Sequence, residues 1–488
     1  MKPNIVYFVA DQLRSDALHH LGNDSAVTPN LDHLATQGVS FQNCYCQNPV
    51  CVPSRCSFLT GLYPHTSGHR TMHYLQKPEE PNILKTMKNN GYQVIWIGRN
   101  DVVPATHDKL AYCDEYYDGI HPENRVDYVE TKPPVHHSYP TTHLKPDELY
   151  SFYIGEQKDS QGFGAMDWGC VHQAIDFLKR KKESQDERPF FLYVTISFPH
   201  PPYGCEKPFY GITDRDHLPP RRPNIDTLKD RPSMLQEIFT KQQLGNWPET
   251  RWNELRATYL DMVNRFDYHY GMVESALKEN GFYDNSGIFV FSDHGDYTGD
   301  YGIAEKVQNC FEDPISNVPL LIKPPIGVDY QAGVHEGLVE LLDLSATVAQ
   351  LTDTKLDYTQ FGTSLLPALN DKQLGKDAVF CEGGRIHGEE QAMEKGHGPE
   401  SPYWPRLSAQ GSEGPEHTKA VMIRQANFKF TKRLYESDEL YDLNNDPQEL
   451  HNLIFIESYQ DVILRMQQRL LQFYMETGDF VPFQRDRR

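Results

Sequence analysis

The chain has 488 residues, of which 38% are hydrophobic, and its 34 prolines and 33 glycines are ordinary for a soluble globular enzyme rich in long loops. Its 68 acidic and 47 basic residues give a formal charge of −21, which argues against nucleic acid or an anionic membrane as the main partner, so an anionic substrate would need a locally positive pocket. The length is too great for one simple core and predicts a large domain with a smaller one attached.

The N-terminal segment contains one lysine and an apolar run that ends at Asp11, so it is too short for a secretory signal or a membrane span. The nine cysteines show no repeating disulfide framework. We therefore expect a cytoplasmic protein with mostly reduced thiols, although export by a signal peptide removed from a longer precursor also fits.

Residues 3–11 form a short apolar run that is typical of a strand buried on both faces. Asp11 and Gln12 stand at its end. A carboxylate at the carboxyl end of a buried strand is costly unless it caps something or binds a cation, and this edge of an α/β sheet is where ligands bind. Residues 29–37 then predict a helix that is capped by Thr28 and closed by Gly38.

The stretch CVPSRCSFLTG, residues 51–61, predicts the N-terminus of a second helix, because Pro53 is tolerated in a first turn. Cys51 lies just ahead of that turn, where free amides and the helix dipole favour anions. Arg55, one turn later, would point a permanent cation at the same spot. On these local features alone, a buried cysteine before an ordinary helix explains the stretch better than a nucleophile does.

Four neighbouring cysteines raise another alternative, a thiolate metal cluster. They are Cys44, Cys46, Cys51 and Cys56. No second group with CxxC spacing accompanies them, which argues against such a cluster.

The pattern of cysteine, any residue, Pro, Ser, Arg, three residues and Leu-Thr-Gly resembles the sulfatase signature without a mismatch. The resemblance implies an α/β fold of the alkaline phosphatase superfamily, with a mixed, mostly parallel sheet between helices. It also implies that Cys51 is oxidised after translation to Cα-formylglycine, whose hydrated aldehyde is the nucleophile. A formylglycine-generating maturation enzyme is therefore an expected partner.

A second family signature, Gly-Tyr, a short strand and Gly-Lys, is similar to the segment that contains Gly91, Tyr92 and Gly98. Arg99 takes the place of the family's lysine, so the resemblance implies a contact between Arg99 and substrate, although a guanidinium is not equivalent to an ammonium. His65 lies on the loop that follows residue 61 and is a further candidate to bind substrate. Residues 103–164 show no clear period and are expected to be loops that line the pocket.

Two later strands also end in polar residues that match the family. Residues 189–200 read as a buried strand that ends at His200. His200 falls in a turn similar to the family's Pro-His-x-Pro and is the candidate acid for the leaving oxygen. An apolar run that begins at residue 286 ends in Asp293 and His294, which resemble the family's Ser-Asp-His-Gly turn. Lys306 falls where the family has a sulfate-binding lysine, and an exposed surface lysine is the alternative for it.

Because separate buried strands end in residues that can bind metal, we expect them to meet around one divalent cation. The predicted ligands are Asp11, Gln12, Cys51, Asp293 and His294. Hard oxygen ligands favour Ca²⁺ or Mg²⁺, and the histidine also admits Mn²⁺, so calcium is the first choice.

A composition shift near residues 372–377 predicts a boundary between a catalytic domain, residues 1–375, and a smaller C-terminal α+β subdomain, residues 376–488. Segments of the latter read as an antiparallel sheet and a closing amphipathic helix, residues 459–477. The residues of that helix expected to face inward are Val462, Met466, Leu470 and Phe473. Residues 388–411 are expected to form a loop that reaches toward the active site.

We therefore predict a formylglycine-dependent sulfatase that acts on a small sulfated saccharide or aryl sulfate. The nucleophile derives from Cys51, while Arg55, Arg99, Lys306 and the cation neutralise the sulfate oxygens and His200 protonates the departing alcohol. One alternative is a related hydrolase of phosphonate monoesters or phosphodiesters. Another is a binding protein on an inactive sulfatase fold, which the intact CVPSR motif argues against.

Overall fold

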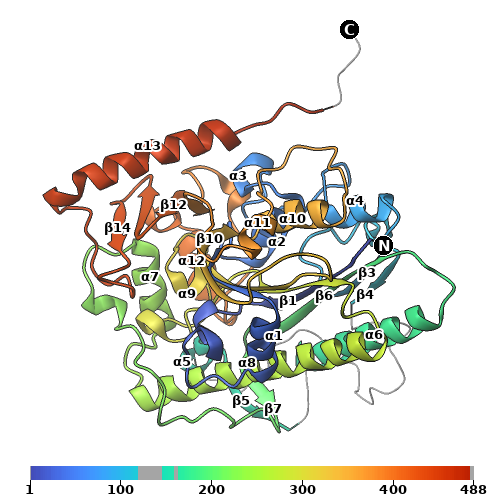
Figure 1. Ribbon diagram of the computed structural model, residues 1–488. Coiled ribbons are helices and arrows are strands. Elements are labelled where there is room, and N and C mark those ends of the chain that lie inside the picture. The colour runs from blue at the N-terminus through green and yellow to red at the C-terminus, as the bar shows by residue number, and fades with distance from the viewer. Residues whose placement is uncertain (1, 119–145, 159–162, 484–488) are drawn as a thin grey trace.

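The computed structural model describes residues 2–118, 146–158 and 163–483, and its largest feature is an eight-stranded sheet with the order β10-β2-β9-β8-β1-β6-β3-β4 (Figure 1). In this order the strands are β10 (Gly333–Glu340), β2 (Val39–Tyr45), β9 (Asn317–Lys323), β8 (Ser286–Ser292), β1 (Asn4–Asp11), β6 (Phe190–Pro199), β3 (Gln93–Gly98) and β4 (Glu115–Tyr117). Neighbours pair in parallel except at β9, which is antiparallel to both β2 and β8. The predicted mixed, mostly parallel sheet is confirmed.

Helices cover both faces of this sheet (Figure 1). One layer contains α1 (Pro29–Gln37), α6 (Phe163–Glu183) and α8 (Glu249–Glu279), and the other contains α2 (Cys51–Thr60), α4 (Ile83–Asn89) and α10 (Asp343–Leu351). Side chains of β1 alternate between the layers, because Phe8 packs on Phe266 of α8 and Tyr7 belongs to the opposite core. Burial on both faces explains why β1 is apolar from Ile5 to Ala10.

Shorter elements surround these layers. They are α3 (Pro64–Ser67), α5 (Pro146–Ser151), α7 (Ser233–Gln242), α9 (Asp313–Ser316), α11 (Leu366–Leu369) and α12 (Trp404–Gln410), with a parallel strand pair formed by β5 (Tyr153–Gln157) and β7 (Tyr203–Glu206). The strand pair was not predicted. No helix in the described part of the chain is long and apolar enough to cross a membrane.

A four-stranded antiparallel sheet follows in the C-terminal part, as predicted. Its strands are β11 (Val379–Gly383), β12 (Ala420–Gln425), β13 (Phe428–Arg433) and β14 (Glu439–Asp442). Val379 and Cys381 pack into the core of the large sheet, whereas Phe380 stacks at 3.9 Å on Phe473 of α13 (Gln460–Thr477). This sheet therefore lies between the main core and α13, while the division at residue 375 stays a prediction.

The inward face of α13 is close to the predicted one. Met466, Leu470 and Phe473 are buried, but Ile463 is buried in place of Val462, which is only partly covered. The difference is one position at the first turn of the helix, where it begins to lie on the sheet.

The carboxyl ends of the parallel strands meet at one edge of the large sheet. Asp11 ends β1, and Arg99, His200 and Asp293 directly follow β3, β6 and β8. Since β2 also ends at this edge, the chain after it delivers Cys51 there. The predicted site residues on these strands therefore come together from distant parts of the sequence.

Candidate active site

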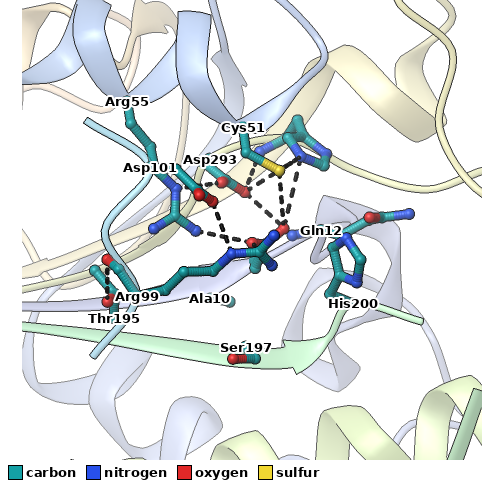
Figure 2. Close-up of polar contacts among 12 residues, drawn as sticks. Ala10, Gln12, Cys51, Arg55, Arg99, Asp101, Thr195, Ser197, His200 and Asp293 are labelled. Atoms are coloured by element: carbon teal, nitrogen blue, oxygen red, sulfur yellow. Dashed lines mark hydrogen bonds and ion pairs between the residues drawn. The ribbon is translucent and has the colours of Figure 1, made fainter. Parts of the chain in front are cut away.

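Cys51 is the first residue of α2, and it faces the ends of β1 and β8 (Figure 2). Its Sγ atom lies 3.5 Å from Asp11 Oδ1 and 3.2 Å from His294 Nε2. The helix start is fixed from the other side by Ser54, whose hydroxyl donates to the Asp293 carbonyl oxygen at 2.5 Å. Cys51 is completely buried, so contacts with other protein groups fix the position of its side chain.

Electron-rich atoms converge around the Cys51 sulfur. His294 Nδ1 donates to the Gly295 carbonyl at 2.9 Å, so the other ring nitrogen, Nε2, carries a free lone pair. The Nε2 atom lies 3.7 Å from Oδ1 of both Asp11 and Asp293. These four side chains are fully buried, and their ligand atoms all lie within 4.8 Å of one another. Buried acceptors that face one another are unfavourable unless a cation lies between them, so this donor set fits a divalent metal ion.

Arg55 bridges the two carboxylates from behind. Its Nε donates to Asp293 Oδ2 at 2.8 Å and its Nη2 to Asp11 Oδ2 at 2.9 Å. Burial would raise the pKa of Asp11, but Arg99, together with His200 and Arg55, holds it well below its usual range. These contacts orient the two carboxylates toward the cluster. Arg55 was also predicted to neutralise substrate oxygens, and that role stays a prediction.

Arg99 is the most open of the cations around Cys51. Its Nη1 lies 3.0 Å from Asp11 Oδ2 and its Nε 2.8 Å from Asp101 Oδ2, while 22% of the side chain is exposed. Gly98 makes this turn possible, because it has a φ of +97° and a Cβ there would lie 2.1 Å from the Thr195 carbonyl oxygen. Arg99 can therefore reach a bound anion without leaving the site.

Lys306 and His200 are two further side chains of the site, and they contact each other. Lys306 Nζ donates to Gln12 Oε1 at 2.8 Å, lies 3.1 Å from His200 Nε2 and pairs with Glu305 at 2.8 Å. His200 Nδ1 donates to the Pro201 carbonyl at 2.6 Å. Burial and the Lys306 cation lower the pKa of His200 well below its ordinary value, so the ring is neutral in this arrangement. Its Nε2 therefore accepts a hydrogen bond from the Lys306 ammonium. The predicted surface alternative for Lys306 does not apply, since it is 3% exposed.

Gln12 takes part in the site differently from the prediction. Its φ of +71° turns the backbone amide toward Asp293 Oδ1, at 3.1 Å, while the side-chain Nε2 donates to Asp296 Oδ2 at 2.6 Å. Asp296 also accepts the Tyr203 hydroxyl at 2.8 Å. The carboxamide oxygen is thereby aimed at Lys306, and Asp296, which follows His294 by two residues, is the side chain that sequence reasoning missed.

His65 is not part of this group. Its Nδ1 contacts Glu382 Oε1 at 2.8 Å, its Nε2 contacts Thr477 Oγ1 at 3.0 Å, and its ring packs 5.3 Å from that of Phe473. Both ring nitrogens are therefore engaged by the C-terminal sheet and α13. These contacts give His65 a packing role, and they do not support the prediction that it binds substrate.

Two other sequence predictions can be compared with the site. Arg406 of α12 lies 3.6 Å from Glu305, so residues 388–411 do reach the surroundings of Lys306. Within the described residues, the groups able to hold a metal do not include Cys44, Cys46 or Cys56. Much of the predicted loop 103–164 lies outside the described residues.

Ion pairs around Cys51 join four cations to four carboxylates. They are Arg55, Arg99, Lys306 and Arg406 with Asp11, Asp101, Asp293 and Glu305. In their ordinary ionised forms these groups sum to zero, and a divalent cation would change the sum to +2, which would attract an anion.

The thiol itself is held in its neutral form. Burial, together with the neighbouring Asp11 carboxylate, raises the pKa of Cys51 well above its ordinary value. An unmodified Cys51 would therefore be a poor nucleophile in this environment.

Comparison with known proteins adds an independent line of evidence. A family model described as Sulfatase matches residues 3–354. An arylsulfatase of Clostridium perfringens is 26% identical, with 95% of this chain and 92% of the relative covered. A choline-sulfatase of Rhizobium meliloti is 26% identical over 93% of this chain and 82% of its own length. A multifunctional alkaline phosphatase superfamily protein, PehA, of Trinickia caryophylli is 25% identical over 98% and 96%.

Solved structures share the fold at lower identity. A phosphonate monoester hydrolase of Agrobacterium radiobacter superposes with a TM-score of 0.77 at 21% identity, covering 98% of this chain and 96% of that one. A 2-O GAG sulfatase superposes with a TM-score of 0.71 at 20% identity, covering 98% and 93%. Both sulfate and phosphonate hydrolases are therefore built on this architecture.

Proposed function

This chain belongs to the sulfatase family, and so to the sulfuric ester hydrolases, and we propose that it hydrolyses a small sulfate ester through a formylglycine derived from Cys51 and a divalent cation. The observation that carries the proposal is the convergence of Asp11, Asp293 and His294 on Cys51 at the start of α2. A nucleophile, a metal site and the amides of a helix N-terminus are thus combined at one edge of the sheet.

Asp11, Asp293, His294 and the side chain of residue 51 would hold the cation. Two carboxylates on a buried site favour Ca²⁺, and Mg²⁺ or Mn²⁺ are the alternatives. Bound there, the cation would supply positive charge that polarises the ester and stabilises the charge that develops on its oxygens. Arg55 keeps the carboxylate oxygens turned toward that position.

The modified residue 51 would supply a hydrated aldehyde, with one hydroxyl to attack sulfur and a second through which sulfate can be released. The protein positions it: α2 directs its amides at the site, and Arg99 and Lys306 lie on opposite sides to bind the equatorial oxygens. Gln12 fixes the Lys306 ammonium by accepting a hydrogen bond from it, and Glu305 does so through an ion pair.

The net charge supports an anionic ester of this kind. With a divalent cation the paired charges sum to +2, which would attract the single negative charge of a sulfate monoester. Without the cation the same groups sum to zero, so the metal should strengthen the binding of substrate as well as catalysis.

His200 is the proposed donor of the proton to the departing oxygen. It is neutral while its Nε2 accepts from Lys306, but a bound anion would favour the charged form of the ring and draw the Lys306 ammonium away. His200 would then hold a proton at Nε2, the atom that faces the site.

The substrate we propose is a small sulfated saccharide, with aryl sulfates as artificial substrates. A phosphonate monoester or phosphodiester is the second candidate, because PehA, a multifunctional member of the wider superfamily, is similar over 98% of this chain. Such esters carry the same single charge, so the charge sum does not separate the two classes.

A matched screen tests the proposal. 4-Nitrophenyl sulfate, sulfated glucosamines, phenyl phosphonate monoesters and bis-(4-nitrophenyl) phosphate should be compared with the Ca²⁺-loaded enzyme, the chelated enzyme and the Asp293→Asn variant. We expect the highest kcat/KM for a sulfate ester, abolished by chelation and by the substitution. A higher kcat/KM for the phosphonate or phosphodiester would overturn the sulfatase assignment of substrate, and full activity after chelation would overturn the metal site.

A further inference from the structure

A second group of potential metal ligands lies in the segment between β11 and β12, apart from the cluster around Cys51. It consists of His387, Glu413 and His417, whose ligand atoms all lie within 4.8 Å of one another. None of these side chains has a role in the proposed sulfatase chemistry.

Backbone pairing brings the two ends of this segment together. The Arg385 amide donates to the His417 carbonyl at 2.9 Å, and Arg385 and Thr418 form an isolated parallel bridge. The His387 ring stacks on Tyr435 with centroids 3.8 Å apart, and its backbone amide donates to the Tyr435 hydroxyl at 2.9 Å. His387 is therefore held beside His417 by contacts that do not use its ring nitrogens.

His417 provides an independent sign that a ligand is expected. The residue is completely buried, yet neither ring nitrogen has a hydrogen-bond partner. A buried polar group left unpaired is energetically costly, so such groups normally have a partner. The ring lies 5.1 Å from that of His387, and one of its nitrogens belongs to the group of converging ligand atoms.

The donor set identifies the class of ion. Two imidazoles and one carboxylate suit Zn²⁺ and the similar ions Co²⁺ and Ni²⁺, whereas Ca²⁺ and Mg²⁺ prefer oxygen ligands. His387 and Glu413 are exposed, so a fourth position would be open to water. The Arg385 guanidinium lies 3.4 Å from Glu413 Oε1, but it also donates to the carbonyls of Gln410 and Ser412, and Glu413 keeps its second oxygen.

We propose that His387, Glu413 and His417 form a zinc-class site that closes the segment between β11 and β12. The chain between His387 and Glu413 carries α12, whose Arg406 contacts Glu305 beside Lys306. The ion would thus clip together the base of the segment that borders the active site. Its role is structural, and its chemistry differs from that of the calcium-type site.

Cobalt provides a direct readout that does not require turnover. In full-length Asp293→Asn protein, where the cluster around Cys51 has lost a carboxylate, Co²⁺ titration should give visible d–d bands that saturate at one equivalent. One equivalent of Zn²⁺ should bleach these bands, and excess Ca²⁺ should not. Zn²⁺ should also raise the Tm of this protein.

Substitution of the exposed ligands locates the ion. In the same background, His387→Ala and Glu413→Gln should each weaken Co²⁺ binding at least about ten-fold, a loss of about 1.4 kcal/mol. His33→Ala, at an exposed histidine elsewhere, is the matched control and should leave the bands unchanged. The proposal would be overturned if the Asp293→Asn protein bound no Co²⁺ at one equivalent. It would also be overturned if the bands persisted after both His387→Ala and Glu413→Gln in that background. Because both positions are exposed, failure to fold is not an expected explanation for loss of the bands.

Discussion

The protein contains two buried clusters of charge that look alike in composition but differ in how their acceptors are used. At the junction with the C-terminal sheet, Lys429 Nζ contacts Glu449 Oε1 at 2.7 Å, the Phe311 carbonyl at 3.0 Å and Asp313 Oδ1 at 2.5 Å. Asp313 also accepts the Tyr45 hydroxyl at 2.8 Å. In this junction cluster every close contact joins a donor to an acceptor.

In the cluster around Cys51, by contrast, several acceptor atoms face other acceptors. Asp11 Oδ1, Asp293 Oδ1 and His294 Nε2 face one another, and all three are acceptors. Protein groups alone join the carboxylates of the junction cluster, whereas the site cluster leaves three acceptor atoms facing one another in a position that a cation could occupy. The difference distinguishes a buried network that stabilises the fold from one that is arranged to bind a ligand.

Asp293→Asn should have the largest effect. It removes a ligand charge but keeps the shape, so we expect metal affinity to fall and kcat/KM to fall by about 10³-fold or more. The free energy of unfolding of the chelated protein should change by less than about 1 kcal/mol, because one carboxylate fewer also relieves repulsion. Calorimetric Ca²⁺ titration and denaturant unfolding measure both quantities, and a large loss of stability with metal affinity intact would contradict the comparison.

Lys429→Met should give the reverse result in the junction cluster. Two buried carboxylates would lose their shared cation, so the free energy of unfolding should fall by about 3–5 kcal/mol. The kcat per folded molecule should stay within about two-fold of the parent, since Lys429 contacts no site residue. Urea unfolding with active-site titration tests this. A selective loss of kcat in stably folded protein would show that the two clusters are coupled.

His200→Ala tests whether the histidine beside Lys306 is the proton donor. If His200 protonates the leaving oxygen, the substitution should reduce kcat on an alkyl or sugar sulfate by about 10²-fold and on an activated aryl sulfate by much less. Lys306 would lose only one of its contacts, so its own position should be kept by Gln12 and Glu305. Equal losses on both substrates would exclude the proton-donor role.

The smallest effect concerns the pH dependence of stability in the junction cluster. Burial, with only partial compensation by Lys429, raises the pKa of Glu449 to about 7. Because the pKa of Glu449 is higher in the folded than in the unfolded state, protonation of Glu449 stabilises the fold. This contribution is fully present at a pH below the ordinary glutamate pKa, and it is lost as the pH rises to about 7. Glu449→Gln should flatten that part of the curve, by at most about 3 kcal/mol. An unchanged slope in urea unfolding between pH 4.5 and 7 would contradict the assignment.

Much of the fold and part of the site could be predicted because the signals are local. Apolar runs that end in Asp11 and Asp293 mark buried strands and their carboxyl ends, and Pro53 marks the start of α2. Parallel pairing then brings these ends together, so their convergence follows from the strand assignments. The resemblance of residues 51–61 to the sulfatase signature identified the family, which the family model confirms, and it pointed to Cys51 as the source of the nucleophile that we propose.

The remaining features depend on partners that are distant in the sequence. Thr28 was expected to cap α1, but the amides of its first turn are bound by Asp267 of α8, 236 residues from Leu31. His65 was expected to bind substrate, but it packs on α13 through Thr477, 412 residues away. Periodicity and capping patterns extend over a few residues, so they cannot specify such tertiary contacts.

The state of residue 51 tests the central claim most directly. Preparations made with different amounts of the maturation enzyme should be digested, and the fraction of Cys51 converted to the aldehyde measured by peptide mass and by reaction with a hydrazide probe. With saturating Ca²⁺, kcat on the best sulfate ester should rise in proportion to that fraction and extrapolate to zero at zero aldehyde, because the buried thiol is neutral and cannot release sulfate. Multiple turnover at the same rate by protein with unmodified Cys51 would contradict the account and point to a metal-activated water as nucleophile.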